Sequence, residues 1–159
     1  LFEDPYVLAV PKNISLESIK NLDDLKKSKE SSVLNNIIQF EFGNQHKKRI
    51  EEWFTSVLPN SRVFAKTRTY EVALSMVQSG RGVAIVPALA ARLGGKKIDF
   101  DVNLYKTNLP QRKIISLIPS QYVRIEPYKS FIGSLVATGK SMQLPKANPV
   151  PPILESLSI

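Results

Sequence analysis

The stretch RVFAKTRTYEVALSMVQSGRGVAIVPALAARLGG, residues 62–95, constrains the fold more than any other part of the chain. It opens with a short strand pattern at residues 62–66 and continues, after a helix pattern, into an apolar run at residues 83–86. A continuous apolar run is typical of a strand covered on both faces, and Pro87 ends it. Two strands joined by a helix of about three turns form a crossover connection, so they should be parallel. The sequence therefore predicts an open α/β sheet.

The helix between these strands has recognisable ends. Thr69 is a suitable N-cap, and Glu71 in the first turn suits the positive end of the helix dipole. One apolar face is formed by Val72, Ala73, Met76 and Val77. Gly80 is expected to end the helix in a left-handed conformation. Because Gly80-x-Gly82 follows a helix and precedes a strand, it does not match a dinucleotide-binding fingerprint.

The remaining elements fit around this unit. Alternating or apolar segments predict strands at residues 6–10, 36–42, 97–102 and 113–118, and helical patterns occupy residues 22–27, 45–57 and 127–136. Residues 28–32 are polar and are expected to form a loop. Beyond Met142 the segment PKANPVPP is rich in proline, so the tail is expected to be extended or disordered.

Composition excludes several classes of function. The chain has 159 residues and no cysteine, which rules out disulfides, thiolate catalysis and zinc–thiolate sites. The sequence contains no run of about 18 apolar residues, so it predicts no membrane span. The net charge is +8, from 22 basic and 14 acidic residues, but the cations are spread along the chain without interleaved aromatic residues. This pattern favours a solvated or anion-attracting surface over direct nucleic-acid binding. The start at Leu1, without methionine or a leader, suggests a piece of a longer protein.

Catalytic and metal-binding motifs are weak. His46 is the single histidine, so a Ser–His–Asp triad would have to use it, and it lies in a predicted first helical turn where a surface role is more common. No spacing of His, Cys or carboxylate residues suits a metal ion. The sequence therefore predicts no catalytic residue, no metal site and no cofactor.

Two strand-to-helix junctions are better candidates for a binding site, because ligands of open α/β sheets lie beyond the carboxyl ends of the strands. The candidate ligand-binding residues are Gly43, Asn44, Gln45, His46, Arg68, Thr69 and Tyr70. For each of them, helix capping or solvation is the alternative role. Lys47 and Lys48 in a first helical turn oppose the helix dipole. Either an anionic ligand relieves this conflict or the two lysines point to water.

Three segments together resemble the effector-binding domain of LysR-type transcriptional regulators. They are FEDPYVLAVPKNISL, FGNQHKKRIEEWF and EVALSMVQSGRGVAIVPALAAR, of which VALSMVQSGRGVAIVP is the most specific. The resemblance covers roughly residues 1–136. It matches residues 2–10 to the strand that crosses between two subdomains and residues 43–45 to the loop that holds the inducer. Thr69 and Tyr70 match the neighbouring helix start.

The resemblance implies an α/β fold similar to periplasmic binding proteins, with an open sheet. The expected parts are one complete second subdomain with its crossover strand (1–103), the returning strand and helix of an incomplete first subdomain (104–140), and the proline-rich tail (141–159). The returning elements would expose apolar residues or pair with another chain: Ile114, Ile115, Leu117, Phe131, Ile132 and Leu135.

The same resemblance implies a function. We expect a cytoplasmic, homo-oligomeric regulator that binds a small anionic effector between its subdomains and contacts DNA only through a helix-turn-helix domain absent from this chain. Effector binding would change the angle between the subdomains. Two alternatives stay open: one lobe of a periplasmic solute-binding protein, and an enzyme on the same fold, such as a prephenate dehydratase-like domain. A leader peptide upstream of Leu1 would favour the first of these.

Overall fold

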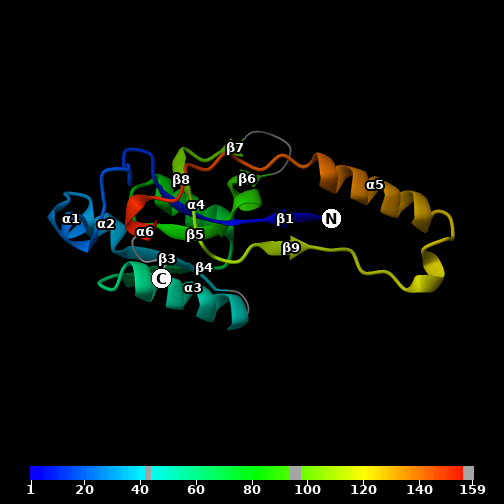
Figure 1. Cartoon of the computed structure of the whole chain (residues 1–159), viewed down its shortest axis with the longest axis horizontal. Helices are drawn as coiled ribbons and strands as arrows, with labels where there is room; N and C mark the ends of the chain where they lie inside the picture. Colours follow the sequence, from blue (N-terminus) through cyan, green and yellow to red (C-terminus); the bar gives the residue numbers. More distant parts are fainter. Residues whose placement is uncertain (42–43, 94–97, 156–159) are drawn as a thin grey trace.

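The computed structural model describes residues 1–41, 44–93 and 98–155, with only the backbone described at residues 44–46, 93 and 98–99 (Figure 1). The strands are β1 (Phe2–Asp4), β2 (Tyr6–Pro11), β3 (Asn36–Phe40), β4 (Arg62–Thr67), β5 (Ala84–Pro87), β6 (Arg92–Leu93), β7 (Ile98–Asp99), β8 (Val102–Lys106) and β9 (Arg112–Ile114). The helices are α1 (Leu22–Lys27), α2 (Ser31–Leu34), α3 (Asn44–Val57), α4 (Tyr70–Gln78), η1 (Ala88–Ala91), η2 (Ser120–Tyr122), α5 (Tyr128–Ser141) and α6 (Pro152–Glu155).

A mixed sheet forms the centre of the molecule. β2 pairs antiparallel with both β5 and β8, and β3 pairs parallel with β4. A parallel bridge between Ile37 and Val83 joins the two groups, so the strand order is β4-β3-β5-β2-β8. β4 and β5 therefore run parallel on either side of β3, and α4 connects them. This arrangement confirms the crossover unit and the open α/β sheet that the sequence predicts.

Strand β2 separates two apolar layers. Tyr6, Leu8 and Val10 belong to one buried cluster, which α3 covers with Trp53 and Phe54. The alternate residues of β2, Val7 and Ala9, belong to a second cluster, which α4 covers with Ala73, Leu74 and Val77. Because successive side chains of a strand point to opposite faces, a strand buried on both faces must be apolar throughout. The sequence of β2 meets this requirement.

The ends of α4 also follow the prediction. The Thr69 hydroxyl accepts a hydrogen bond from the amide of Val72, as an N-cap does. Gly80 has a φ of 71°, the left-handed conformation that suits glycine after a helix. The helix predicted at residues 45–57 is α3, which starts one residue earlier, at Asn44.

Several predicted boundaries are different in the structure. Part of the polar segment 28–32 belongs to the short helix α2, whose Leu34 is buried. The strand predicted at residues 97–102 is divided between β7 and β8, and Lys97 lies outside the described residues. The strand predicted at residues 113–118 ends at Ile114, because its partner β1 has no residue paired beyond Phe2. A strand pattern without a partner strand forms no ladder.

An arm extends from the sheet. It consists of β1, β9 and α5, and α5 lies to one side of the sheet rather than on either face (Figure 1). Leu117 and Phe131 of this arm are 88% and 63% exposed. Ile115 is exposed as well, whereas Ile114, Ile132 and Leu135 are partly buried. The expectation of exposed apolar residues therefore holds for three of the six predicted positions.

The tail is more structured than the sequence predicts. Residues 142–151 have no regular helix, as expected of a proline-rich segment, but Asn148 forms a parallel bridge with Tyr105 of β8. The tail then forms α6, and its Ile153 and Leu154 are buried in the core. Of the two predicted forms, the extended one fits residues 142–151, whereas disorder does not fit the tail up to Glu155. Two large aliphatic residues after the prolines are buried against an apolar surface.

We predict opposite effects for alanine at two glycines. A Cβ on Gly82 would lie 2.3 Å from the carbonyl oxygen of Asn36, so β5 would have to move away from β3. Gly82→Ala should lower the free energy of unfolding by about 1–3 kcal/mol. The control, Gly133→Ala in α5, has open space around the new Cβ and should be neutral or stabilising by about 0.5–1 kcal/mol. Urea unfolding followed by circular dichroism measures both; equal losses would contradict the close approach at Gly82.

Candidate functional site

The candidate site lies where the parallel strands of the sheet end. β3 ends at Phe40, β4 ends at Thr67 and β5 ends at Pro87. The register pairs Phe40 with Thr67, and it pairs Pro87 with Tyr6 at the start of β2. These four residues therefore lie along one edge of the sheet. In open α/β sheets this edge is the usual position of a ligand.

An aromatic pair lies at this edge. The rings of Phe40 and Tyr70 are stacked, with centroids 4.0 Å apart and an interplanar angle of 25°. Burial raises the pKa of Tyr70 to about 12, and the nearby Tyr6 adds to the effect. The hydroxyl of Thr67 is buried and has no hydrogen-bond partner within the described part of the chain. The aromatic pair provides an apolar surface, and Thr67 contributes an unsatisfied polar group.

A buried ion pair connects the arm to the sheet. The Asp4 carboxylate is fully buried, and its Oδ2 lies 2.6 Å from Nη2 of Arg112 and accepts a hydrogen bond of 2.8 Å from the Nε–H. Its Oδ1 accepts a hydrogen bond of 3.0 Å from the amide of Leu89. Asp4 therefore joins β1, β9 and η1. The Arg112 side chain remains 30% exposed, so it is not sealed in the protein as Asp4 is.

The aromatic pair and the ion pair are close neighbours. Arg112 lowers and Asp4 raises the pKa of Tyr70, although burial is the largest cause of the net increase. The same two residues act on Tyr6, whose pKa is raised by burial, and Arg49 of α3 acts on it as well. Two guanidinium groups and one carboxylate therefore act on Tyr6. The local charge is positive, which suits an anionic ligand.

The predicted binding residues are only partly covered by the structure. Tyr70 lies in the aromatic pair, and Thr69 caps α4 with its hydroxyl, as the capping alternative expects. Arg68 is exposed. Gly43 lies outside the described residues. Asn44, Gln45 and His46 form the first turn of α3, and their side chains are outside the described part of the chain.

The two lysines at the start of α3 have protein partners. Lys47 lies 3.9 Å from carboxylate oxygens of both Glu41 and Glu51, and Lys48 lies 3.8 Å from Glu52. Lys66 also pairs with Glu41, at 3.1 Å, and lowers its pKa. An anionic ligand is therefore not needed to explain the lysines. Carboxylates one helical turn later offset their conflict with the dipole.

Sequence reasoning missed four residues of this site: Asp4, Tyr6, Phe40 and Arg112. Asp4 and Arg112 are far apart in the sequence, and although Asp4 lies in the segment FEDPYVLAVPKNISL, nothing in that segment indicates Arg112 as its partner. One signal was available, because Asp4 lies two residues before the apolar strand β2, and a charged residue is unusual in a segment expected to be buried. Among the described residues, no group of His, Cys, Asp and Glu is arranged to hold a metal ion.

The profile of the LysR substrate binding domain family matches residues 1–136. The chain therefore belongs to the LysR substrate-binding domain family. No curated protein matches the chain. No helix in the described ranges is both long and apolar enough to cross a membrane.

Solved structures share the fold. The CcmR regulatory domain of Synechocystis PCC6803, in complex with 2-PG, has a TM-score of 0.55 and 13% identity, over 94% of this chain and 66% of that chain. The effector-binding domain of QuiR, in complex with shikimate, has a TM-score of 0.51 and 17% identity, over 91% of this chain and 65% of that chain. This chain thus spans slightly less than two thirds of each. At these identities the likeness shows the fold alone.

We predict that the ion pair is important for stability. Arg112→Ala leaves the buried Asp4 carboxylate without its counter-ion, which should lower the free energy of unfolding by about 3 kcal/mol, the lower end of the range for a broken buried pair. The lower end applies because Arg112 is partly exposed. Lys113→Ala, at an exposed position of the same strand, is the control and should change little. Chemical denaturation tests this, and equal stability of the two variants would contradict it.

We predict that ionisation of Tyr70 lowers the stability of the folded protein at high pH. Its pKa rises from 10.0 to about 12 on folding, so the folded state retains the phenolic proton more tightly than the unfolded state. This contribution is complete below pH 10.0 and is lost as the pH rises through about 12. The free energy of unfolding of Tyr70→Phe should therefore fall less over this range. Urea unfolding at stepped pH measures the difference, with Tyr128→Phe, at an exposed tyrosine, as the control.

Proposed function

We propose that this chain is the effector-binding regulatory part of a LysR-type transcriptional regulator and that it senses a small anionic metabolite. The observation that carries the proposal is the cluster of aromatic and charged side chains at the sheet edge. Phe40 and Tyr70 offer a flat apolar surface, and Arg112 offers a partly exposed cation beside it. This combination suits a small molecule with both an apolar body and a negative charge.

The proposed negative charge of the effector follows from the balance of charged groups around Tyr6. Arg49 and Arg112 both act on Tyr6, whereas Asp4 is the one carboxylate among the groups that shift its pKa. A carboxylate or phosphate ligand can accept hydrogen bonds from a guanidinium, and such charge-assisted bonds are stronger than neutral ones. The fold relatives CcmR and QuiR hold 2-PG and shikimate, which supports a small-molecule site in this fold.

The predicted junction residues complete the proposed site. Tyr70 supplies one ring of the aromatic surface, and Arg68 supplies a further exposed cation close to it in sequence. Asn44, Gln45 and His46 begin α3 after β3 has ended at Phe40, so we assign their backbone to the same edge of the sheet. Gly43 is included in the proposed site from the sequence alone. The unpartnered hydroxyl of Thr67 offers a hydrogen bond to a ligand or to water.

The remaining parts of the proposal concern the whole regulator. We assign residues 1–103 to one complete effector-binding subdomain with its crossover strand, and residues 104–140 to elements that pack against another subdomain. Within the second range, residues 104–106 still belong to β8 of the central sheet. The exposed Leu117 and Phe131 of the arm support this division, because large apolar side chains are usually covered. We propose that a separate helix-turn-helix domain contacts DNA. We also propose that the regulator forms homo-oligomers and acts in the cytoplasm.

The proposed role is regulatory and not catalytic. Effector binding between the arm and the sheet favours the subdomain angle in which both sides contact the ligand. Arg112 lies on the arm, and Tyr70 lies on the sheet side, so one anion in contact with both would couple binding to this angle. The family match favours this role over a transport lobe or an enzyme on the same fold.

A binding experiment with a double variant, in which uncharged residues replace both members of the ion pair, tests the proposal. Asp4→Asn together with Arg112→Gln removes both charges but keeps polar side chains at both positions. A panel of small carboxylates and phosphates is first screened by thermal shift, and hits are measured by calorimetry. We expect the double variant to bind about ten- to a hundredfold more weakly, the value of a lost charge-assisted hydrogen bond.

Lys113→Gln, at an exposed position of the same strand, is the matched control and should bind like the wild type. Equal affinity of the double variant and the control would contradict a role for Arg112. Stabilisation by uncharged compounds alone would contradict an anionic effector. An electrophoretic mobility assay with this chain should show no DNA binding, since that role is assigned elsewhere.

A further inference from the structure

The segment 143–155, which we call the strap, lies beyond the family match at residues 1–136. It leaves the end of α5 and returns along the sheet to α6, so it joins the arm to the sheet (Figure 1). Two other connections link the same parts: Pro5 between β1 and β2, and residues 107–111 between β8 and β9. The strap is therefore a third connection between the arm and the sheet.

The middle of the strap covers a sheet edge. The amide of Asn148 donates a hydrogen bond of 2.7 Å to the carbonyl of Leu104, and the amide of Lys106 donates one of 3.0 Å to the carbonyl of Asn148. These two bonds form the parallel bridge at Tyr105. Without the strap, β8 would be an open edge strand with unpaired backbone groups. Main-chain groups hold the strap at this point, and its side chains Leu144, Ala147 and Val150 pack on either side of it against the two buried clusters.

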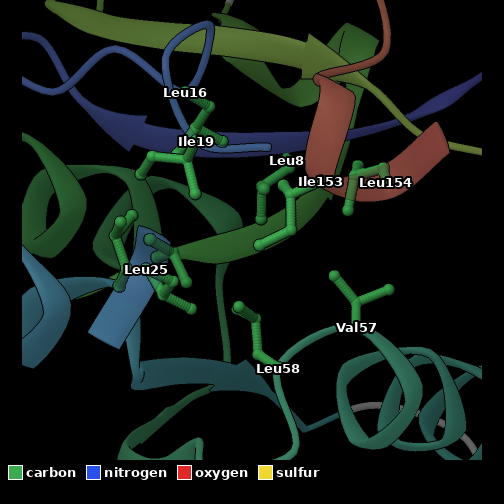
Figure 2. Close-up of a pocket in the computed structure, with 10 residues that line it drawn as sticks. Leu8, Leu16, Ile19, Leu25, Val57, Leu58, Ile153 and Leu154 are labelled. Atoms are coloured by element: carbon green, nitrogen blue, oxygen red, sulfur yellow. The ribbon is translucent and has the colours of Figure 1, made fainter. Parts of the chain in front are cut away.

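The far end of the strap is anchored in the core. Ile153 and Leu154 of α6 are 3% and 2% exposed and point into an apolar space beside β2 (Figure 2). The other side chains that line this space are Leu8, Leu16, Ile19, Leu25, Leu34, Val57, Leu58 and Val83. About 20 Å³ remains free, room for a single water, so the two strap residues nearly fill it. The space is an anchoring slot for the strap and not a ligand pocket.

The near end of the strap is attached to the arm. Gly139, in the last turns of α5, lies so close to Leu1 that a Cβ there would be 3.1 Å from the Leu1 carbonyl oxygen. The Leu1 amino group in turn donates to the carbonyl of Ile114. Just beyond α5, the Arg92 guanidinium donates to the carbonyl of Gln143. The strap therefore starts at the end of α5, close to the start of β1, and its first residue is also bonded to β6.

We propose that the strap limits movement of the arm relative to the sheet and that docking of Ile153 and Leu154 sets this limit. Two short connections permit rotation of the arm as a hinge, whereas a third one, fixed at both ends, restricts it. The strap crosses β8 with two backbone hydrogen bonds, so it can open without unfolding of β2. This inference rests on the proposed function, in which effector binding changes the angle between the arm and the sheet.

Two full-length variants test the strap at its middle. Asn148→Pro removes the amide that bonds to Leu104, and Asn148→Ala, which keeps the main-chain groups, is the matched control. By hydrogen exchange, the Lys106 amide should lose protection in Asn148→Pro while the amides of β2 keep theirs. Simultaneous loss of protection in β2 would mean that the strap is an inseparable part of the core, and it would overturn the proposal.

A distance measurement tests the movement of the arm. The chain has no cysteine, so Lys48→Cys on α3 and Lys129→Cys on α5, both exposed, give two clean positions for spin labels. The distance distribution should broaden when Asn148→Pro or Ile153→Asp is added, and it should stay unchanged with Asn148→Ala. Unchanged distributions in both strap variants would overturn the proposal. Neither readout uses a ligand, so a failure of effector binding would leave these results intact.

Discussion

Burial of β2 on both faces is the constraint on which the rest of the structure depends. Its alternate residues enter two separate cores, so α3 and α4 must each cover one side of the sheet. Its antiparallel register with β5 sets Tyr6 opposite Pro87, at the edge where the parallel strands end. The packing of an apolar strand thus determines where the polar and aromatic groups of the candidate site meet. The site is a consequence of the core.

The sequence predicts the fold best where the signal is local. The unit β4-α4-β5 carries its own periodicity, its own cap at Thr69 and its own stop at Gly80, and the structure has all of them. The prediction fails where an element needs a distant partner. Residues 115–118 have the composition of a strand, but β1 gives them nothing to pair with. Ile153 follows a proline-rich stretch, and its burial depends on a slot built from residues far earlier in the chain.

The candidate site was predictable in part for the same reason. Tyr70 is found because a helix start after a strand is visible in sequence. The pairing of Asp4 with Arg112 is not visible, since the two residues are neighbours on the paired strands β1 and β9 but lie 108 positions apart in the sequence. Lys47 shows how a local pattern can leave two interpretations open. A first-turn lysine looks unsatisfied when only the helix dipole is considered, yet Glu41 and Glu51 lie within ion-pair distance.

The buried carboxylate of Asp4 links these observations to regulation. Asp4 must keep a counter-ion, because an unpaired buried charge is costly. An anionic effector near Arg112 would compete with Asp4 for the guanidinium, and Asp4 also holds the amide of Leu89 on the sheet side. A shift of Arg112 towards a ligand would therefore also affect the hydrogen bond that joins Asp4 of β1 to the amide of Leu89 in η1. A ligand changes the angle only if it binds one arrangement of arm and sheet more tightly than the other. In the proposed regulatory role, the carboxylate that Arg112 and Leu89 share would provide this difference.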